Sequence, residues 1–131
     1  MLISMKKLLI LLFSILISFN SYGEWVKVTE SATGNTHYVD TDTIKEHNGY
    51  VYWWELNDYL KPDKWGDMSH KVYRQGDCDV NRDKPLSYIY YKQRMGEGKS
   101  EVYNPPNPEW SYPPPESIGE SISNYVCDYV D

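Results

Sequence analysis

Six of the eight prolines in this chain of 131 residues fall within residues 104–115, and that segment divides the chain into two parts. Proline has no N–H for a strand ladder or a helix interior, so neither element crosses the segment. We expect an extended, polyproline-like strap with Trp110 packed beneath it. The alternative is a PxxP ligand, Pro105 to Pro108, for a partner domain. The regular elements of the fold must therefore lie before and after this strap.

Strand-like runs rich in Tyr, Trp and Val occupy the part before the strap. Asn48-Gly49 lies between two such runs and predicts a hairpin, because both central residues of a type I′ turn need positive φ. The run Tyr50–Leu56 carries apolar residues on both faces, which is typical of a central strand. The other runs are Trp25–Val28, Thr36–Asp40, His70–Gln75, Leu86–Met95 and Lys99–Tyr103. Together they predict an antiparallel meander of about six strands.

One amphipathic helix is predicted after the strap. Ser117 and Glu120 form a capping-box pattern, and the apolar residues beyond them fall on one helical face. These are Ile118, Ile122, Tyr125, Val126 and Tyr129. The predicted class is therefore α+β, mostly β, with the C-terminal helix packed on a face of the sheet.

Residues 1–23 have the pattern of a secretory signal peptide, which leaves residues 24–131 as the mature domain. Lys6 and Lys7 give a positive start, an apolar run of about 12 residues comes next, and Ser21 and Gly23 suit a cleavage site. A run of this length is shorter than the roughly 20 residues of a membrane span, although an uncleaved anchor is the alternative. We therefore expect an exported protein that is periplasmic, secreted or at the cell surface, with no membrane anchor after cleavage.

Cys78 and Cys127 are the two cysteines of the chain, and in an exported protein we expect them to form a disulfide. The bridge would close a loop of about 50 residues and tie the helix to the sheet. Cys127 lies nearly opposite Ile118 on a helical wheel. Either the helix frays before Cys127, or the bridge lies at the edge of the docked face.

Composition and charge argue against several functions. Cleavage removes two of the 13 basic residues and none of the 19 acidic ones, so the net charge changes from −6 to −8. Such a charge argues against nucleic acid as a partner. The mature chain keeps five Trp and twelve Tyr but no Phe, so every aromatic residue has a polar atom as well as an apolar ring.

No set of residues predicts catalysis, and we expect a non-enzymatic protein without a metal or other cofactor. His37, His47 and His70 lack metal-ligand spacing, and no glycine-rich phosphate loop is present. Acidic side chains alternate from Asp77 to Asp83 as in a calcium loop, but Arg82 occupies the position that needs glycine.

A basic, tyrosine-rich segment runs from Ser69 to Arg94 in this acidic chain. Such a segment suits an anionic or extended partner, although a solvated sheet face of mixed charge is the alternative. The candidate protein-binding residues are Lys71, Arg74, Arg82, Lys84, Tyr88 and Lys92.

The order of several short motifs resembles the bacterial surface-adhesin protein E family. They span about residues 25–127 and include both cysteines. The matching pieces are His37-Tyr38-Val39-Asp40, Trp54-Glu55-Leu56-Asn57-Asp58-Tyr59, Ser69-His70-Lys71, Asp77-Cys78, Met95-Gly96, Glu109-Trp110 and Pro115-Glu116-Ser117-Ile118-Gly119-Glu120.

The resemblance implies an antiparallel sheet with a C-terminal helix tied to it by the cysteine pair. It also implies a role at the cell surface in binding host extracellular-matrix or serum proteins through the segment around the first cysteine. Here that segment is Lys71 to Lys92, although this chain lacks a lipid-anchor cysteine. The alternative function is a periplasmic structural or accessory protein that forms a homodimer through an uncovered sheet face.

Overall fold

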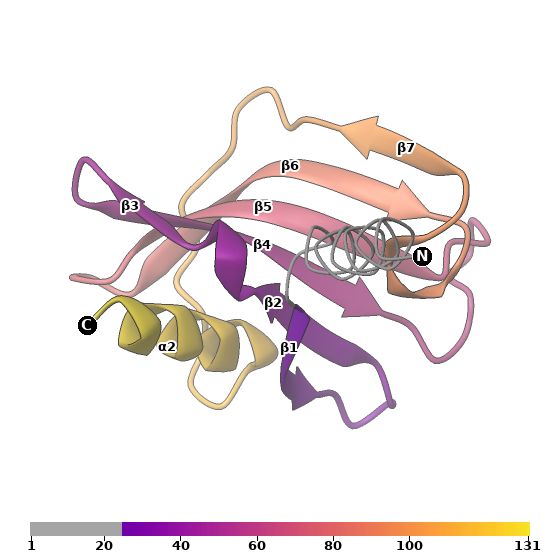
Figure 1. Ribbon diagram of the computed structural model, residues 1–131, viewed down its shortest axis with the longest axis horizontal. Helices are drawn as coiled ribbons and strands as arrows, with labels where there is room; N and C mark the ends of the chain where they lie inside the picture. The colour runs from indigo at the N-terminus through magenta and orange to yellow at the C-terminus, as the bar shows by residue number, and fades with distance from the viewer. Residues whose placement is uncertain (1–24) are drawn as a thin grey trace, which may run out of the picture.

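Seven antiparallel strands form one sheet in the computed structural model, which describes residues 25–131 (Figure 1). The predicted signal segment, residues 1–23, lies outside the described residues. The order is β1-β2-β4-β5-β6-β7, and β3 pairs with the other half of the β4 edge that β2 occupies. The bounds are Trp25–Glu30 for β1, Thr36–Asp40 for β2, Lys45–His47 for β3, Tyr50–Asp58 for β4, Ser69–Asp77 for β5, Arg82–Tyr91 for β6 and Ser100–Tyr103 for β7. The predicted meander is confirmed.

The hairpin between β3 and β4 turns at Asn48 and Gly49, as predicted. Both residues have positive φ, 51° and 83°. The short strand β3 is the element beyond the six that the sequence indicated. It comes after a one-turn 3-10 helix, η1 (Thr41–Thr43), whose N-cap is Asp40.

Strand β6 begins and ends earlier than its hydrophobic pattern, Leu86–Met95, indicates. It begins at Arg82, includes Pro85 and ends at Tyr91. Proline fits here for two reasons. The register with β5 shifts at this point, where Leu86 is the extra residue of a bulge, and β7 pairs only with residues 88–91. The N–H that proline lacks would therefore have faced an open edge.

The chain leaves β6 through η2 (Arg94–Gly96), which folds back over the end of β4. The buried carboxylate of Asp58 accepts hydrogen bonds from Arg94 Nη2 at 2.7 Å and from the Met95 N–H at 2.7 Å. Ser69 Oγ accepts a further bond from the Gly96 N–H. These bonds hold Met95 at a φ of 57° and end the strand that the sequence extended to this residue.

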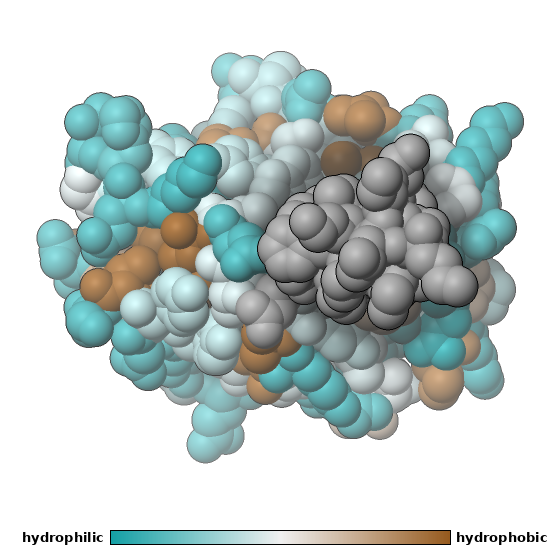
Figure 2. All heavy atoms as spheres, in the orientation of Figure 1, coloured by the Kyte–Doolittle hydropathy of each residue, from teal (hydrophilic) through white to brown (hydrophobic). Residues whose placement is uncertain are grey.

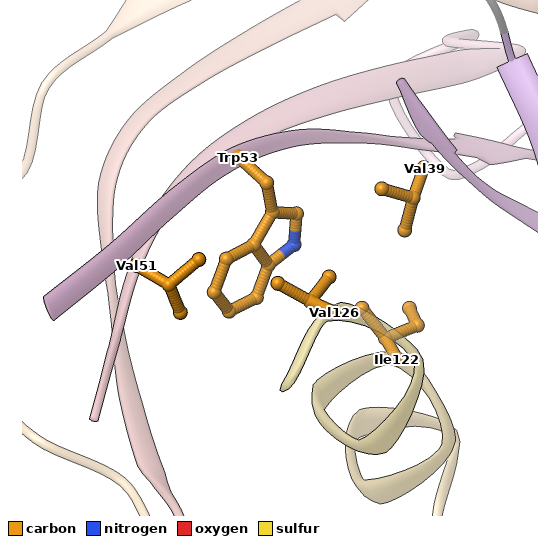
Figure 3. Packing of buried hydrophobic residues seen from close by; sticks show 5 residues of the cluster. All are labelled: Val39, Val51, Trp53, Ile122 and Val126. Carbon is orange, nitrogen blue, oxygen red and sulfur yellow. The ribbon is translucent and has the colours of Figure 1, made fainter. Parts of the chain in front are cut away.

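Helix α2 (Ile118–Val130) packs against one face of the sheet, chiefly on β1 and β4 (Figure 1). The core between them consists of five buried side chains, and the Trp53 ring lies among the valines and isoleucine of both layers (Figure 3). They are Val39, Val51, Trp53, Ile122 and Val126. Gly76 is required beneath the indole, because a Cβ there would meet Trp53 Cζ3 at 2.6 Å.

The ends of α2 are fixed in two ways. Ser117 Oγ caps the first turn by accepting the Glu120 N–H at 3.1 Å, while the Glu120 carboxylate accepts the Glu116 N–H. At the other end, Cys127 forms a disulfide with Cys78 in the β5–β6 turn. The helix continues to Val130, so the bridge lies at the edge of the docked face and the helix does not fray before it.

The proline-rich strap runs from β7 to α2 and crosses the edge of β6 on its way. Asp83 and Ser111 exchange two backbone hydrogen bonds, of 3.0 and 2.8 Å, at this crossing. Trp110 lies on one side of it, against Tyr50, and Pro113 and Pro114 line a cavity beside α2 on the other. The strap prediction is therefore confirmed.

We use two names for the sides of the sheet. The helix face carries Val51, Trp53, Glu55 and Asn57 of β4, and the open face carries the alternate residues, such as Trp54. In the view of Figure 2, hydrophobic residues form small separate groups among hydrophilic ones. No helix within residues 25–131 is long and apolar enough to span a membrane.

Candidate protein-binding surface

The structure divides the predicted binding residues between the two sides of the sheet. Lys71, Arg82 and Lys84 lie on the open face, whereas Arg74 and Tyr88 lie on the helix face and Lys92 comes after β6 beside that face. A strand alternates its side chains, so residues three apart on β5 point in opposite directions. One flat partner therefore contacts only part of the set.

Arg82 and Lys84 form the most concentrated part of the open-face set, together with Trp110. The Arg82 guanidinium lies 4.2 Å from the centre of the Trp110 ring, and the Lys84 Nζ lies 4.4 Å from it. Tyr50 packs on the same ring at 5.5 Å between ring centres. We call Tyr50, Arg82, Lys84 and Trp110 the Trp110 patch; Arg82 and Lys84 lie close in the chain to Cys78.

The charges of the Trp110 patch differ in how they are paired. Arg82 Nε donates to the Asp77 carboxylate at 3.2 Å. Lys84 forms no ion pair with any of the residues 25–131. Its ammonium lies over the indole face with no carboxylate partner among these residues, so a partner protein can pair with it.

Lys71 lies elsewhere on the open face, against Leu56 of β4. Its Nζ is 5.4 Å from the centre of the Trp25 ring and 5.1 Å from that of Tyr91. The lysine stem covers apolar rings in this position while its charge remains at the surface.

Arg74 has a structural position on the helix face. Its Nε donates to Glu55, and its Nη1 donates to Asp83 at 3.1 Å. The side chains of these acids are only 3% and 11% exposed. Burial raises the pKa of the Asp83 carboxyl, and the neighbouring guanidinium opposes that rise. Arg74 thus neutralises two buried carboxylates and is not displayed to a partner.

Tyr88 belongs to a cluster of rings that continues the helix face beyond α2. It stacks on Tyr90 at 5.9 Å and on Tyr103 at 6.2 Å, and its ring centre is 6.3 Å from that of His70. His70 also hydrogen-bonds to Tyr59 and to Asn57. Sequence patterning places these residues on strands but does not show that their rings meet, because that depends on the register.

His70 predicts a pH dependence of stability. Burial, assisted by nearby His37, lowers the pKa of His70 from 6.5 to about 4. Because the pKa of His70 is lower in the folded protein than in the unfolded chain, protonation favours unfolding. The stability that neutral, buried His70 contributes is therefore fully present above pH 6.5 and is lost as the pH falls toward 4. We expect a loss of about 3 kcal/mol across this window from this group.

Urea unfolding at pH 7 and pH 4 measures this effect. In His70→Gln the fall in stability between the two pH values should be smaller than in the wild type by about that amount. His47→Gln is the control, because His47 is exposed on β3. An equal fall in His70→Gln and the wild type would contradict the assignment.

The β4–β5 connection holds an exposed tryptophan to which none of the sequence motifs above points. Trp65 is 67% exposed. Lys92 tethers the loop, since its Nζ donates to the Trp65 carbonyl at 2.9 Å and pairs with Asp67 at 2.9 Å. The signal that could have found this site is a tryptophan within a loop of charged residues.

Comparisons with known proteins agree with this fold. The family model described as surface-adhesin protein E matches residues 25–128. A crystal form of Haemophilus influenzae protein E superposes with a TM-score of 0.64 at 14% identity, covering 82% of this chain and 90% of that one. Protein E from non-typeable Haemophilus influenzae gives a TM-score of 0.57 at 13% identity, with coverage of 79% and 75%. No curated protein matches this chain.

These findings have different weight. The structural likenesses have low identity and show a common fold. The family match extends over almost all described residues, and the family is one of surface adhesins and not of enzymes. The resemblance seen in the sequence motifs is therefore confirmed: this chain belongs to the surface-adhesin protein E family.

Proposed function

We propose that this protein is an exported, non-enzymatic binding module that recognises an extracellular-matrix or envelope protein through the Trp110 patch. The observation that carries the proposal is the position of two cations over one indole ring, at 4.2 and 4.4 Å. Membership of an adhesin family supports the class of function. Both cations also lie in the segment around the first cysteine, which the sequence singles out.

The residue types of the patch suit a protein interface. Trp, Tyr and Arg carry most of the binding energy at protein–protein contacts. Tyr112 adds a ring that is 63% exposed, two residues beyond Trp110. The strap is anchored to β6 by the Asp83–Ser111 backbone bonds, so these side chains are held in place before a partner arrives.

The charge of the patch indicates the kind of partner segment. Lys84 has no ion-pair partner within residues 25–131, and Lys71 extends the cationic character of the open face across β5. An acidic segment of a partner would therefore be attracted to this face, and the attraction would weaken as salt increases. Arg74, Tyr88 and Lys92 lie outside this surface.

A binding assay tests the proposal. The purified protein is passed over surfaces coated with basement-membrane extract, serum proteins or bacterial envelope proteins, and the double variant Arg82→Glu/Lys84→Glu is compared with it. We expect the variant to lose at least about tenfold in affinity, mainly through slower association.

The control is Lys27→Glu/Lys45→Glu, which makes the same change of charge at exposed sites on β1 and β3. Equal loss in both double variants would show a general charge effect and contradict the patch. Absence of binding to all three surfaces, together with a dimer in sedimentation, would instead support the alternative of an accessory homodimer.

A further inference from the structure

We propose that a groove beside Trp65, on the helix face, binds a neutral oligosaccharide. The groove has a volume of about 500 Å³ and is lined by Trp65, Asp67, Tyr90, Lys92, Glu101 and Tyr103. It lies on the opposite side of the sheet from the Trp110 patch, so it is a second, separate site.

Three aromatic residues, Trp65, Tyr90 and Tyr103, line this groove. Tyr90 and Tyr103 both flank Tyr88, which stacks on each of them at interplanar angles of 10° and 29°. Tyr88 lies between these two rings and is not itself part of the groove lining. Tyr103 is 52% exposed and Trp65 is 67% exposed, so both rings are accessible. The electron-rich face of such a ring attracts the polarised C–H groups on the flat side of a pyranose.

Several hydrogen bonds fix the Trp65 loop. Asp63 Oδ1 accepts hydrogen bonds from the N–H groups of Trp65 at 3.0 Å and Asp67 at 2.8 Å. Gly66 supplies the positive φ, 81°, that the turn needs. Lys92 ties the loop to the sheet through the Trp65 carbonyl. A fixed loop that displays an exposed indole is arranged for contact, because little entropy is lost on binding.

The polar groups around the rings favour an uncharged, hydroxyl-rich ligand. Two carboxylates, Asp67 and Glu101, and two ammonium groups, Lys92 and Lys99, surround the rings. Asp67 and Lys92 pair with each other at 2.9 Å, whereas Glu101 can accept and Lys99 can donate a hydrogen bond to a ligand. The charges of these four groups cancel, and the ammonium of Lys64, 4.3 Å from the centre of the Trp65 ring, is offset by the Asp63 carboxylate of the same loop. A sulfated polymer or a polycation would therefore gain little from this site, whereas sugar hydroxyls find both donors and acceptors.

The groove continues beyond the tryptophan. A second cavity of about 400 Å³ shares Asp67, Tyr90, Lys92 and Glu101 with the first and adds Lys99 and Ser100 at the start of β7. The surface is therefore extended, which suits a chain of at least two sugar rings better than a single one.

Nuclear magnetic resonance of the purified protein tests the proposal. The chain has five tryptophans and therefore five indole N–H signals. The signal that is missing from the spectrum of Trp65→Phe is that of Trp65. Cellotriose, maltotriose and chitotriose are titrated separately to about 10 mM, since binding in a shallow groove lies in the millimolar range. We expect at least one of them to shift the Trp65 signal and leave the Trp53 signal in place.

Substitutions then test the groove. Trp65→Ala and Tyr103→Ala should each lower the affinity about tenfold or more. Tyr129→Ala should not change it, because that ring is also exposed but lies on α2. If no neutral trisaccharide shifts the Trp65 signal, the proposal is wrong. It is equally wrong if only a heparin hexasaccharide or only a lysine-rich peptide shifts this signal. The Trp110 patch is judged by the separate binding assay.

Discussion

Arg74→Met is expected to lower the free energy of unfolding by about 3–5 kcal/mol at pH 7. Methionine fills a similar space but removes the cation that pairs with Glu55 and Asp83. Both carboxylates would then be buried beside each other without a counter-charge, and removing one partner of a buried ion pair has this large effect. Urea denaturation measures the change.

The pH dependence of Arg74→Met distinguishes lost charge pairing from lost packing. Burial already raises the pKa of Asp83, and removal of Arg74 would raise it further. A raised folded-state pKa means that stability falls as the pH rises from about 4, the unfolded value, through the raised value. The variant should therefore approach the wild type as the pH is lowered toward 4.

Two further variants make this prediction specific. Glu55→Gln/Arg74→Met/Asp83→Asn should recover much of the stability, because neutral amides need no cation. Lys27→Met should change stability by less than about 1 kcal/mol, since its ion pair with Glu30 is half exposed. A deficit in Arg74→Met that is the same at pH 4 and pH 7 would show that packing, not charge, is responsible.

Local sequence signals predicted the elements of this fold well. The Asn48-Gly49 turn and the Ser117 cap each depend on a few residues that are close in the chain. The disulfide was predicted from the expectation that the protein is exported. The end of β6 was predicted less well. Met95 leaves the strand because Asp58 and Ser69, far away in the sequence, bind the backbone of η2. No hydrophobic pattern reports such a contact.

The candidate surface shows the same limit. Arg82 and Lys84 are two residues apart on one strand, so alternation alone places them together. Lys71 and Arg74 are three apart, and the same alternation separates them. The Trp65 groove was not foreseen, because its tyrosines come from β6 and β7 and reach the loop through tertiary contacts such as the Lys92 bond to the Trp65 carbonyl. A count of charged residues along the chain cannot distinguish these surfaces, because it assigns the residues of both faces to one segment.

Removal of the disulfide is expected to cost about 4 kcal/mol, as much as the loss of the Arg74 cation. The bridge joins residues 49 apart, and a loop of this length gives that value in the chain-entropy model. A domain of roughly a hundred residues has a stability of about 5–15 kcal/mol. The variant Cys78→Ser/Cys127→Ser should therefore lose a large part of it, as urea denaturation would show.

Hydrogen exchange would show where that stability is lost. The bridge holds the last turn of α2 against the β5–β6 turn, whereas β4 and β5 are joined by eight residue pairs in register. The α2 amides should therefore exchange through local opening before those of β4 and β5. A reductant should reproduce this pattern in the wild type and change nothing in the serine variant. If the variant stayed within about 1 kcal/mol of the wild type, the packing of α2 on Trp53 would be enough to hold the helix on the sheet without the disulfide. If it behaves as expected, the fold depends on an oxidising compartment, which is where an adhesin acts.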